Sequence, residues 1–313
     1  MGRRFFLIDG LSQIFRCYYA PFRSLNAPSG EPTRATYVFT NMLLQLIREQ
    51  KPDYLAMAMD SAEGPVFREA IDPAYKAQRE PPPEDLAPQI ARILQIVESQ
   101  GVPILSVAGF EADDVMATIC GRLAGEDVEV YLVSKDKDLD QLLSERVRLF
   151  DPGKEEVIGP AELEQTKGYR PEQAIEVQTL CGDTVDNVPG VKGVGPKKAA
   201  ALIAKYGTAE NVLAHAEELT PAMRENVKAF AGQAATTRQL VTLRRDVPIA
   251  FDLGRCRWAG LDGRRLQPIF AELGFRRLFE QFAEERDSGF GARDPGLQER
   301  GSGLGARDPG EKA

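Results

Sequence analysis

Gly109-Phe110-Glu111-Ala112-Asp113-Asp114 places three carboxylates within four residues, between an apolar run and a segment with helical periodicity. Residues 103–108 predict a buried strand, and the apolar positions Val115, Ile119 and Leu123 predict a helix. The acids therefore fall on the first turn of a helix that follows a strand. Helix capping explains one acid at such a position, whereas three adjacent acids also suit a bound cation. Both interpretations remain open for this motif alone.

Three other apolar runs show the same arrangement of a strand followed by acids and a helix. Residues 3–9, 54–59 and 128–134 predict strands, and helical patterns cover residues 11–19, 33–50 and 84–100. Strands that alternate with helices form a mostly parallel sheet that helices cover on both faces. The sequence therefore predicts an α/β fold.

Each of these predicted strands ends in acids. Asp9 and Asp60 follow the first two strands, and Asp136 and Asp138 follow the fourth. A single acid after a strand is usually a cap or turn residue, but four such coincidences are hard to explain in this way. Ligands bind at the carboxyl edge of open α/β sheets, so we expect these acids to share one site with Glu111 and its neighbours.

Composition excludes several function classes. The chain has 313 residues, a hydrophobic fraction of 43% and no apolar stretch near the about 18 residues of a membrane span. The four cysteines show no Cys-x-x-Cys spacing, which argues against zinc knuckles and disulfides. His215 is the only histidine, which removes Ser-His and Cys-His chemistry and favours a carboxylate-metal mechanism for a hydrolase. We expect a cytoplasmic monomer.

Residues 61–83 form an unusually long connection with five prolines. Its basic residues Arg68, Lys76 and Arg79 lie close in sequence to the aromatic residues Phe67 and Tyr75. Such a mixture suits a loop that grips a phosphate backbone and stacks on bases. The alternative is a solvated loop stiffened by proline.

The second part of the chain changes character. Residues 146–150 and 155–158 predict an antiparallel strand pair at the sheet edge, and after Gly159 the pattern is helical only. Two further acids, Asp183 and Asp186, lie in a loop there. Helices are predicted over residues 172–180, 209–216, 221–231, 234–244 and 263–285. We therefore predict a catalytic domain over residues 1–170 and a helical domain over residues 171–286.

Glycines and lysines surround the start of one predicted helix. The segment Gly190-Val191-Lys192-Gly193-Val194-Gly195-Pro196-Lys197-Lys198 lacks the spacing of a P-loop and follows no strand. It is similar to the helix-hairpin-helix of DNA-binding proteins, whose backbone amides approach a phosphate at a helix N-terminus. A plain turn between helices is the alternative. The predicted DNA contacts of this hairpin are Lys192, Gly193, Gly195, Lys197 and Lys198.

The net charge of −8 argues at first against a nucleic-acid partner. The nine acids assigned to the site outweigh that charge, and without them the chain carries +1. Residues 190–246 contain nine Lys or Arg against five Asp or Glu, a local charge of +4. This distribution is compatible with phosphodiester binding. The last part of the chain repeats Ser-Gly-x-Gly-Ala-Arg-Asp-Pro-Gly at residues 288 and 302, and we predict a disordered tail over residues 287–313.

Seven motifs in order resemble the 5′-to-3′ exonuclease domain of bacterial DNA polymerase I, within the flap endonuclease family. The resemblance covers residues 4–285 and rests on Leu7-Ile8-Asp9-Gly10, Gly30-Glu31-Pro32-Thr33, Tyr75-Lys76-x-x-Arg79, Glu111-Ala112-Asp113-Asp114, Asp136-Lys137-Asp138-Leu139-x-Gln141-Leu142, Gly182-Asp183-x-x-Asp186-Asn187 and the Gly190 hairpin. It implies a PIN-like sheet flanked by helices and followed by a small helix-hairpin-helix domain. The departures at Met59, Ser134 and Asp140 remove no ligand.

The resemblance also implies the site. It assigns Asp9, Asp60, Glu111, Asp113 and Asp114 chiefly to one Mg²⁺, and Asp136, Asp138, Asp183 and Asp186 to a second. Mn²⁺ would substitute for Mg²⁺, and K⁺ is a candidate at the hairpin. Lys76 and Arg79 would contact the scissile phosphate from a helical arch over residues 61–88, and Arg16, Arg68 and Tyr75 are further predicted DNA contacts.

The implied activity is structure-specific hydrolysis of DNA that has a duplex and a free 5′ end, in replication and repair. No polymerase motif follows, so we expect a stand-alone nuclease with a separate polymerase as a partner. Two alternatives remain. A non-catalytic scaffold of the same fold would lack metal ligands, and a PIN-type ribonuclease would lack the hairpin and the arch.

Overall fold

The computed structural model describes residues 2–280, so the predicted tail over residues 287–313 lies outside the described residues. None of the helices in this range is long and apolar enough to span a membrane.

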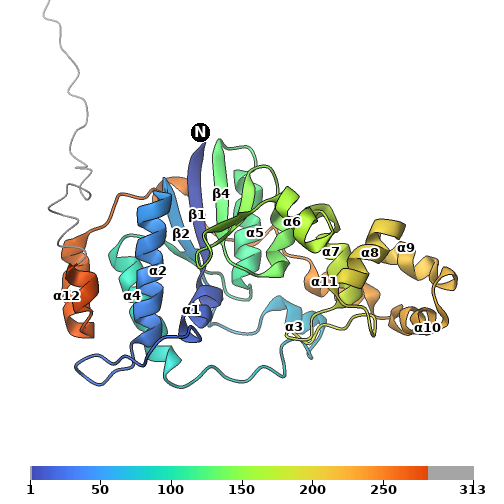
Figure 1. Cartoon of the computed structure of the whole chain (residues 1–313), viewed down its shortest axis with the longest axis horizontal. Coiled ribbons are helices and arrows are strands. Elements are labelled where there is room, and N and C mark those ends of the chain that lie inside the picture. Colours follow the sequence, from blue (N-terminus) through green and yellow to red (C-terminus); the bar gives the residue numbers. More distant parts are fainter. Residues whose placement is uncertain (1, 281–313) are drawn as a thin grey trace, which may run out of the picture.

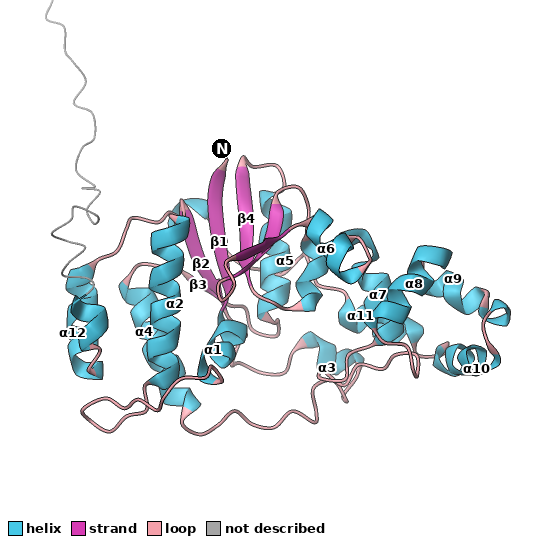
Figure 2. Cartoon of the chain, in the orientation of Figure 1, coloured by secondary structure: helices cyan, strands magenta, loops and turns pink. Residues whose placement is uncertain are grey.

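A six-stranded sheet occupies the middle of the N-terminal part (Figure 2). Its strands are β1 (Arg3–Asp9), β2 (Tyr54–Ala58), β3 (Ile104–Leu105), β4 (Val128–Val133), β5 (Val147–Asp151) and β6 (Glu156–Ile158), in the order β3-β2-β1-β4-β5-β6. Only β6 is antiparallel, so the predicted mostly parallel sheet with an antiparallel edge is confirmed. The predicted strand over residues 103–108 shrinks to two residues, because this edge strand pairs only with Met57 and Ala58.

Helices cover both faces of this sheet (Figure 1). Phe6 and Ile8 of β1 pack in one core with α1 (Gly10–Tyr18), α2 (Arg34–Gln50) and α4 (Leu86–Ser99). Phe5 and Leu7 point to the opposite face and pack in a core with α5 (Ala112–Leu123). The alternation of side chains along a strand produces these two cores.

The helical part contains α6 (Pro160–Lys167), α7 (Ala174–Cys181), α8 (Pro196–Tyr206), α9 (Ala209–Ala214), α10 (Pro221–Phe230) and α11 (Ala234–Val241), with short 3₁₀ turns at Pro171–Gln173, Ala216–Glu218 and Leu253–Cys256. Most of its buried apolar residues belong to the same core as α5, so the hydrophobic interior runs from the sheet into these helices, while Leu240 and Val241 of α11 form a smaller cluster with Tyr75 and Val188. The last helix, α12 (Gly263–Leu273), packs near α4. The prediction of one helix over residues 263–285 was wrong, because Gly274 adopts a left-handed conformation that ends it.

The segment after Asp136 forms a 3₁₀ helix, Lys137–Leu142, in which Leu139 and Leu142 are buried three residues apart, as the 3₁₀ period requires. One local prediction also needs correction. The long connection contains one short helix, α3 (Phe67–Ile71), where a helical arch was expected. Figure 1 shows α3 beside α11, from where the chain returns to α4.

Candidate active site

The acids at the strand ends lie where the strand order of the sheet reverses, between β1 and β4. β1 pairs with β2 on one side and with β4 on the other, which makes the carboxyl end of β1 the topological switch point of the sheet. Asp9 ends β1, and its Oδ1 accepts the Ser12 amide at 3.3 Å and so caps α1. Its Oδ2 accepts a hydrogen bond of 2.7 Å from Ser134, which follows β4. Ser134 thereby joins the ends of the two central strands.

Asp60 joins the β2 end to the motif before α5. Its Oδ1 accepts the amide of Ala112 at 2.6 Å, which fixes the first turn of α5 beside the end of β2. Asp113 on that turn lies in the electrostatic field of Asp9, Asp60, Asp136 and Asp138. The acids from four strands thus form one cluster.

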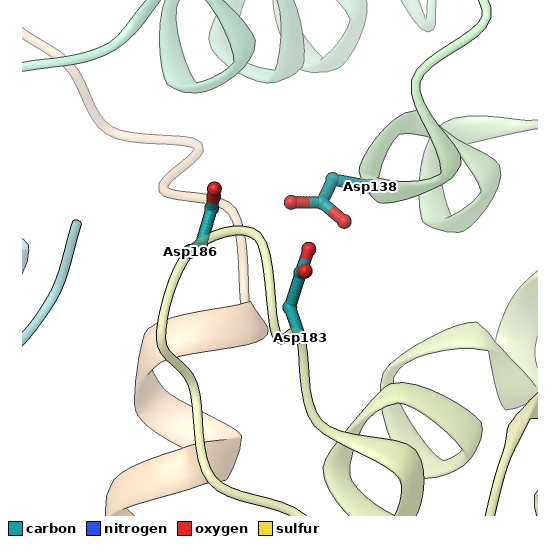
Figure 3. A group of neighbouring side chains, drawn as sticks. All are labelled: Asp138, Asp183 and Asp186. Atoms are coloured by element: carbon teal, nitrogen blue, oxygen red, sulfur yellow. The ribbon is translucent and has the colours of Figure 1, made fainter. Parts of the chain in front are cut away.

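A second group of carboxylates adjoins this cluster from the helical part. Figure 3 shows Asp138 directed towards Asp183 and Asp186, which lie in the loop after α7. One carboxylate oxygen of each residue lies within 4.8 Å of the others. The loop closes because Gly182 and Gly190 approach backbone to backbone: a Cβ on Gly190 would lie 2.4 Å from the carbonyl carbon of Cys181.

Burial and mutual repulsion make this cluster electrostatically unfavourable without a cation. Burial, supplemented by neighbouring aspartates, raises the pKa of Asp9 to about 7 and that of Asp138 to about 7. The same causes raise the pKa of Asp113 well above its usual value, and burial raises the pKa of Asp60. A donor set made of carboxylates suits hard divalent ions, so the residues present fit a metal centre.

Two cations of the long connection lie on the cluster. Lys76 Nζ contacts Glu111 and lies 3.6 Å from Asp186, while Arg79 forms an ion pair with Asp186. Burial alone would raise the pKa of Glu111, but Lys76 and Arg68 outweigh it and lower that pKa. The structure therefore places Lys76 and Arg79 at the site predicted for them.

Asp114 lies apart from the cluster. It is fully buried, and Arg68 donates to its two oxygens at 2.6 and 2.9 Å. The Arg244 amide donates a third hydrogen bond of 2.8 Å. The structure does not bring Asp114 into the predicted metal centre, because these donors already occupy its carboxylate.

Burial argues against the predicted DNA contacts of Arg68 and Tyr75. Arg68 is 2% exposed and also donates to Glu111 at 2.7 Å. Tyr75 is 5% exposed, and its hydroxyl donates to Glu111 at 2.9 Å. Both side chains support Glu111 from the interior, where neither a phosphate nor a base can reach them.

The remaining predicted DNA contacts are accessible. Arg16 on α1 forms an ion pair of 2.7 Å with Asp151 and is one-third exposed. In the hairpin, Gly193 has a φ of 76°, and Gly195 precedes Pro196, the first residue of α8. The three hairpin lysines Lys192, Lys197 and Lys198 are exposed.

Sequence reasoning missed several residues that orient these acids. Gln178 of α7 donates a hydrogen bond of 2.6 Å to Asp138, and Lys137 forms an ion pair of 2.9 Å with Asp183. Gln178 is 4% exposed, so a polar residue on the inward face of a predicted helix was the available signal. Lys137 lies between Asp136 and Asp138, and nothing in the sequence distinguishes it from a lysine that is simply exposed to solvent.

Comparison with known proteins identifies the family. Residues 4–168 match the family described as 5′-3′ exonuclease, N-terminal resolvase-like domain, and residues 169–264 match 5′-3′ exonuclease, C-terminal SAM fold. The chain belongs to the 5′-3′ exonuclease family. The 5′-3′ exonuclease of Aquifex aeolicus is 34% identical over 88% of this chain and 94% of that protein. Thermostable DNA polymerase I of Thermus thermophilus is 39% identical over 89% of this chain but only 33% of its own length.

The chain spans about a third of the length of the polymerase relatives. Its fold is similar to that of T5 5′-exonuclease with divalent zinc ions bound, with a TM-score of 0.63 and 24% identity over 76% of this chain and 89% of that one. The catalytic core of Rad2 in complex with DNA substrate has a TM-score of 0.59 and 15% identity, over 87% and 88% of the two chains. These likenesses confirm the predicted PIN-like fold.

Proposed function

We propose that this exonuclease hydrolyses DNA phosphodiester bonds near a free 5′ end, as a structure-specific exonuclease and flap endonuclease in replication and repair. The observation that carries the proposal is the convergence of acids from four strand ends and one helical loop on a single cluster. Cations would stabilise the ionised form of the buried acids whose pKa values are raised, and the family relationship supplies the reaction class.

Two Mg²⁺ ions are the proposed cofactors, with Mn²⁺ as a substitute. Asp9, Asp60, Glu111 and Asp113 would hold one ion, and Asp136, Asp138, Asp183 and Asp186 would hold the other. Metal ions held there would supply the activation of a water molecule and the stabilisation of the leaving 3′ oxygen. The chain contributes the geometry, because Ser134, the Ala112 amide and Gln178 fix the carboxylates of Asp9, Asp60 and Asp138 respectively.

Lys76 and Arg79 are the proposed catalytic cations. Both lie on the acidic cluster and reach it from a segment with exposed residues on either side. Donors in this position can bind the phosphate oxygens, whose negative charge grows in the transition state. Their present partners, Glu111 and Asp186, belong to the two proposed metal groups.

The hairpin is the proposed site for the duplex. Its exposed glycines allow backbone amides at the α8 N-terminus to approach a phosphate, and its lysines add charge. We propose on this basis that residues 1–170 carry the chemistry, and that residues 171–286 bind duplex and complete the second metal group. K⁺ at the hairpin stays a prediction.

The test compares end-labelled flap, nicked, blunt and single-stranded DNA, and single-stranded RNA, with and without Mg²⁺. Flap and nicked substrates should be cleaved near the 5′ end, and excess EDTA should abolish cleavage. Asp138→Asn should lower the turnover by orders of magnitude, whereas the control Asp127→Asn, at the opposite edge of the sheet, should not. Full activity in EDTA or in Asp138→Asn would contradict the two-metal proposal, and cleavage restricted to RNA would favour the ribonuclease alternative.

A further inference from the structure

A buried carboxylate outside the acidic cluster holds two cations. Asp151 ends β5 and is 3% exposed. Its Oδ1 lies 2.7 Å from Arg16 Nη1 and accepts the amide of Gly153 at 3.0 Å. Its Oδ2 lies 2.6 Å from Lys135 Nζ. One carboxylate therefore fixes an arginine and a lysine that lie far apart in the sequence.

The turn after β5 leaves space for the arginine. A Cβ on Gly153 would lie 2.0 Å from Arg16 Nη2, so any side chain at this position would displace the guanidinium. The guanidinium is thus held by the carboxylate on one side and limited by the turn on the other.

Both cations lie on segments that carry proposed metal ligands. Lys135 immediately precedes Asp136, and Arg16 lies in the last turn of α1, the helix that Asp9 caps. Their side chains remain 33% and 47% exposed. The trio is therefore accessible from solvent near the carboxyl ends of β1 and β4.

The charge of the trio is unbalanced. One carboxylate faces two cations, which leaves one positive charge, and a guanidinium with five donors and an ammonium with three keep donors free for a further acceptor. One cation is enough to neutralise the buried carboxylate of Asp151. The second cation is in excess, and two cations held side by side by an acid can bind an anion.

We propose that Arg16 and Lys135 bind one backbone phosphate of the substrate strand beside the acidic centre, and that Asp151 is the positioning residue that holds them together. The inference rests on the proposed function, since the phosphate belongs to the nucleic acid substrate. It adds Lys135 and Asp151 to the residues that act on DNA and assigns a joint role to Arg16.

The test measures the binding of a 5′-flap substrate as a function of salt, with Asp138→Asn in every protein so that the strand stays intact. Lys135→Ala should reduce the slope of log K against log[salt] by up to about 0.9, which corresponds to up to about eightfold weaker binding at 0.1 M salt. Lys135→Arg should restore the slope, because it keeps the charge.

Asp151→Asn separates positioning from charge. The substitution makes the protein less negative by one unit, so a purely electrostatic effect would tighten DNA binding. Positioning predicts the reverse, a several-fold weaker binding, because Arg16 and Lys135 lose their common anchor. The control Asp127→Asn makes the same change of charge beside Arg146, at the amino end of β4, and should bind at least as tightly as the parent.

Gly153→Ala gives a second variant in case Asp151→Asn does not fold. It displaces Arg16 without any change of charge and should also weaken binding. An unchanged salt slope in Lys135→Ala, or Asp151→Asn and Gly153→Ala proteins that fold and bind like the control, would overturn the inference. Failure of the wild-type protein to bind or cleave any DNA substrate would instead contradict the proposed function.

Discussion

The family resemblance assigns both Asp114 and Asp138 to the metal site, yet the structure predicts opposite effects on stability when each is replaced by Asn. Asp114→Asn removes one of the two carboxylates that face buried Arg68, which then keeps Glu111 as its remaining ion-pair partner. Loss of one partner of a buried ion pair costs about 3–5 kcal/mol, and the remaining contact with Glu111 favours the lower end. At about 2–4 °C per kcal/mol, the melting temperature should fall by about 6–12 °C.

Asp138→Asn should not lower the stability of the metal-free protein. Burial, followed by repulsion from Asp136, raises the pKa of Asp138 from 3.8 to about 7 in the folded state. The folded protein therefore binds more protons than the unfolded chain between these two values, and its stability falls as the pH rises through this window. Above pH 7 the ionised carboxylate is fully destabilising, and Asn removes this effect.

Thermal melts in EDTA at pH 5 and pH 8 test both statements. The melting temperature of Asp138→Asn should equal or exceed that of wild type, with the larger advantage at pH 8. Mg²⁺ should then raise the melting temperature of wild type more than that of Asp138→Asn, because an ion that binds only the folded state stabilises it. If Asp114→Asn melts like wild type, or if Asp138→Asn loses as much stability in EDTA as Asp114→Asn does, the separation of the two acids is wrong.

Three further predictions concern the cations and the loops. Lys76→Ala and Arg79→Ala should lower the single-turnover rate of bound substrate more than they weaken binding, and an unchanged maximal rate would reduce both residues to backbone contacts. Lys197→Ala with Lys198→Ala should reduce the salt slope of duplex binding by about 0.9 for each lysine that binds a phosphate, while the rate at saturating protein is kept; a wild-type slope would make the hairpin a plain turn. Gly190→Ala should weaken Mg²⁺ binding by calorimetry, because its Cβ would lie 2.4 Å from the Cys181 carbonyl carbon and open the loop of Asp183 and Asp186; wild-type Mg²⁺ affinity would show that this closure is dispensable.

The periodic part of the fold could be predicted from the sequence. Strands such as β1 and β4 are continuous apolar runs followed by acids, so the parallel sheet and the edge that carries the acids followed from the pattern. Burial of charged residues could not be predicted in this way. The sequence places Arg68 in a proline-rich loop, where a basic side chain is expected to be exposed to solvent. It is buried because α3 packs against the rest of the protein.

The same limit applies within the acidic motif. Asp113 and Asp114 are adjacent and chemically identical, but a helix turns by about 100° between neighbours, so one faces the cluster and the other faces the interior. The sequence does not say which of the two finds a buried arginine. The family resemblance grouped them together, whereas the three donors on Asp114 distinguish them.

The continuous core explains how acids from two parts of the chain can act as one site. The second group combines Asp138, which follows β4, with Asp183 and Asp186, which follow α7. These loops hold their relative positions only if α7 is fixed to the sheet, and the shared core of α5 and α7 together with the bond from Gln178 to Asp138 provides that connection. Any change that loosens α7 from this core should therefore act first on the second metal group, while the strand-end acids Asp9 and Asp60 keep their place.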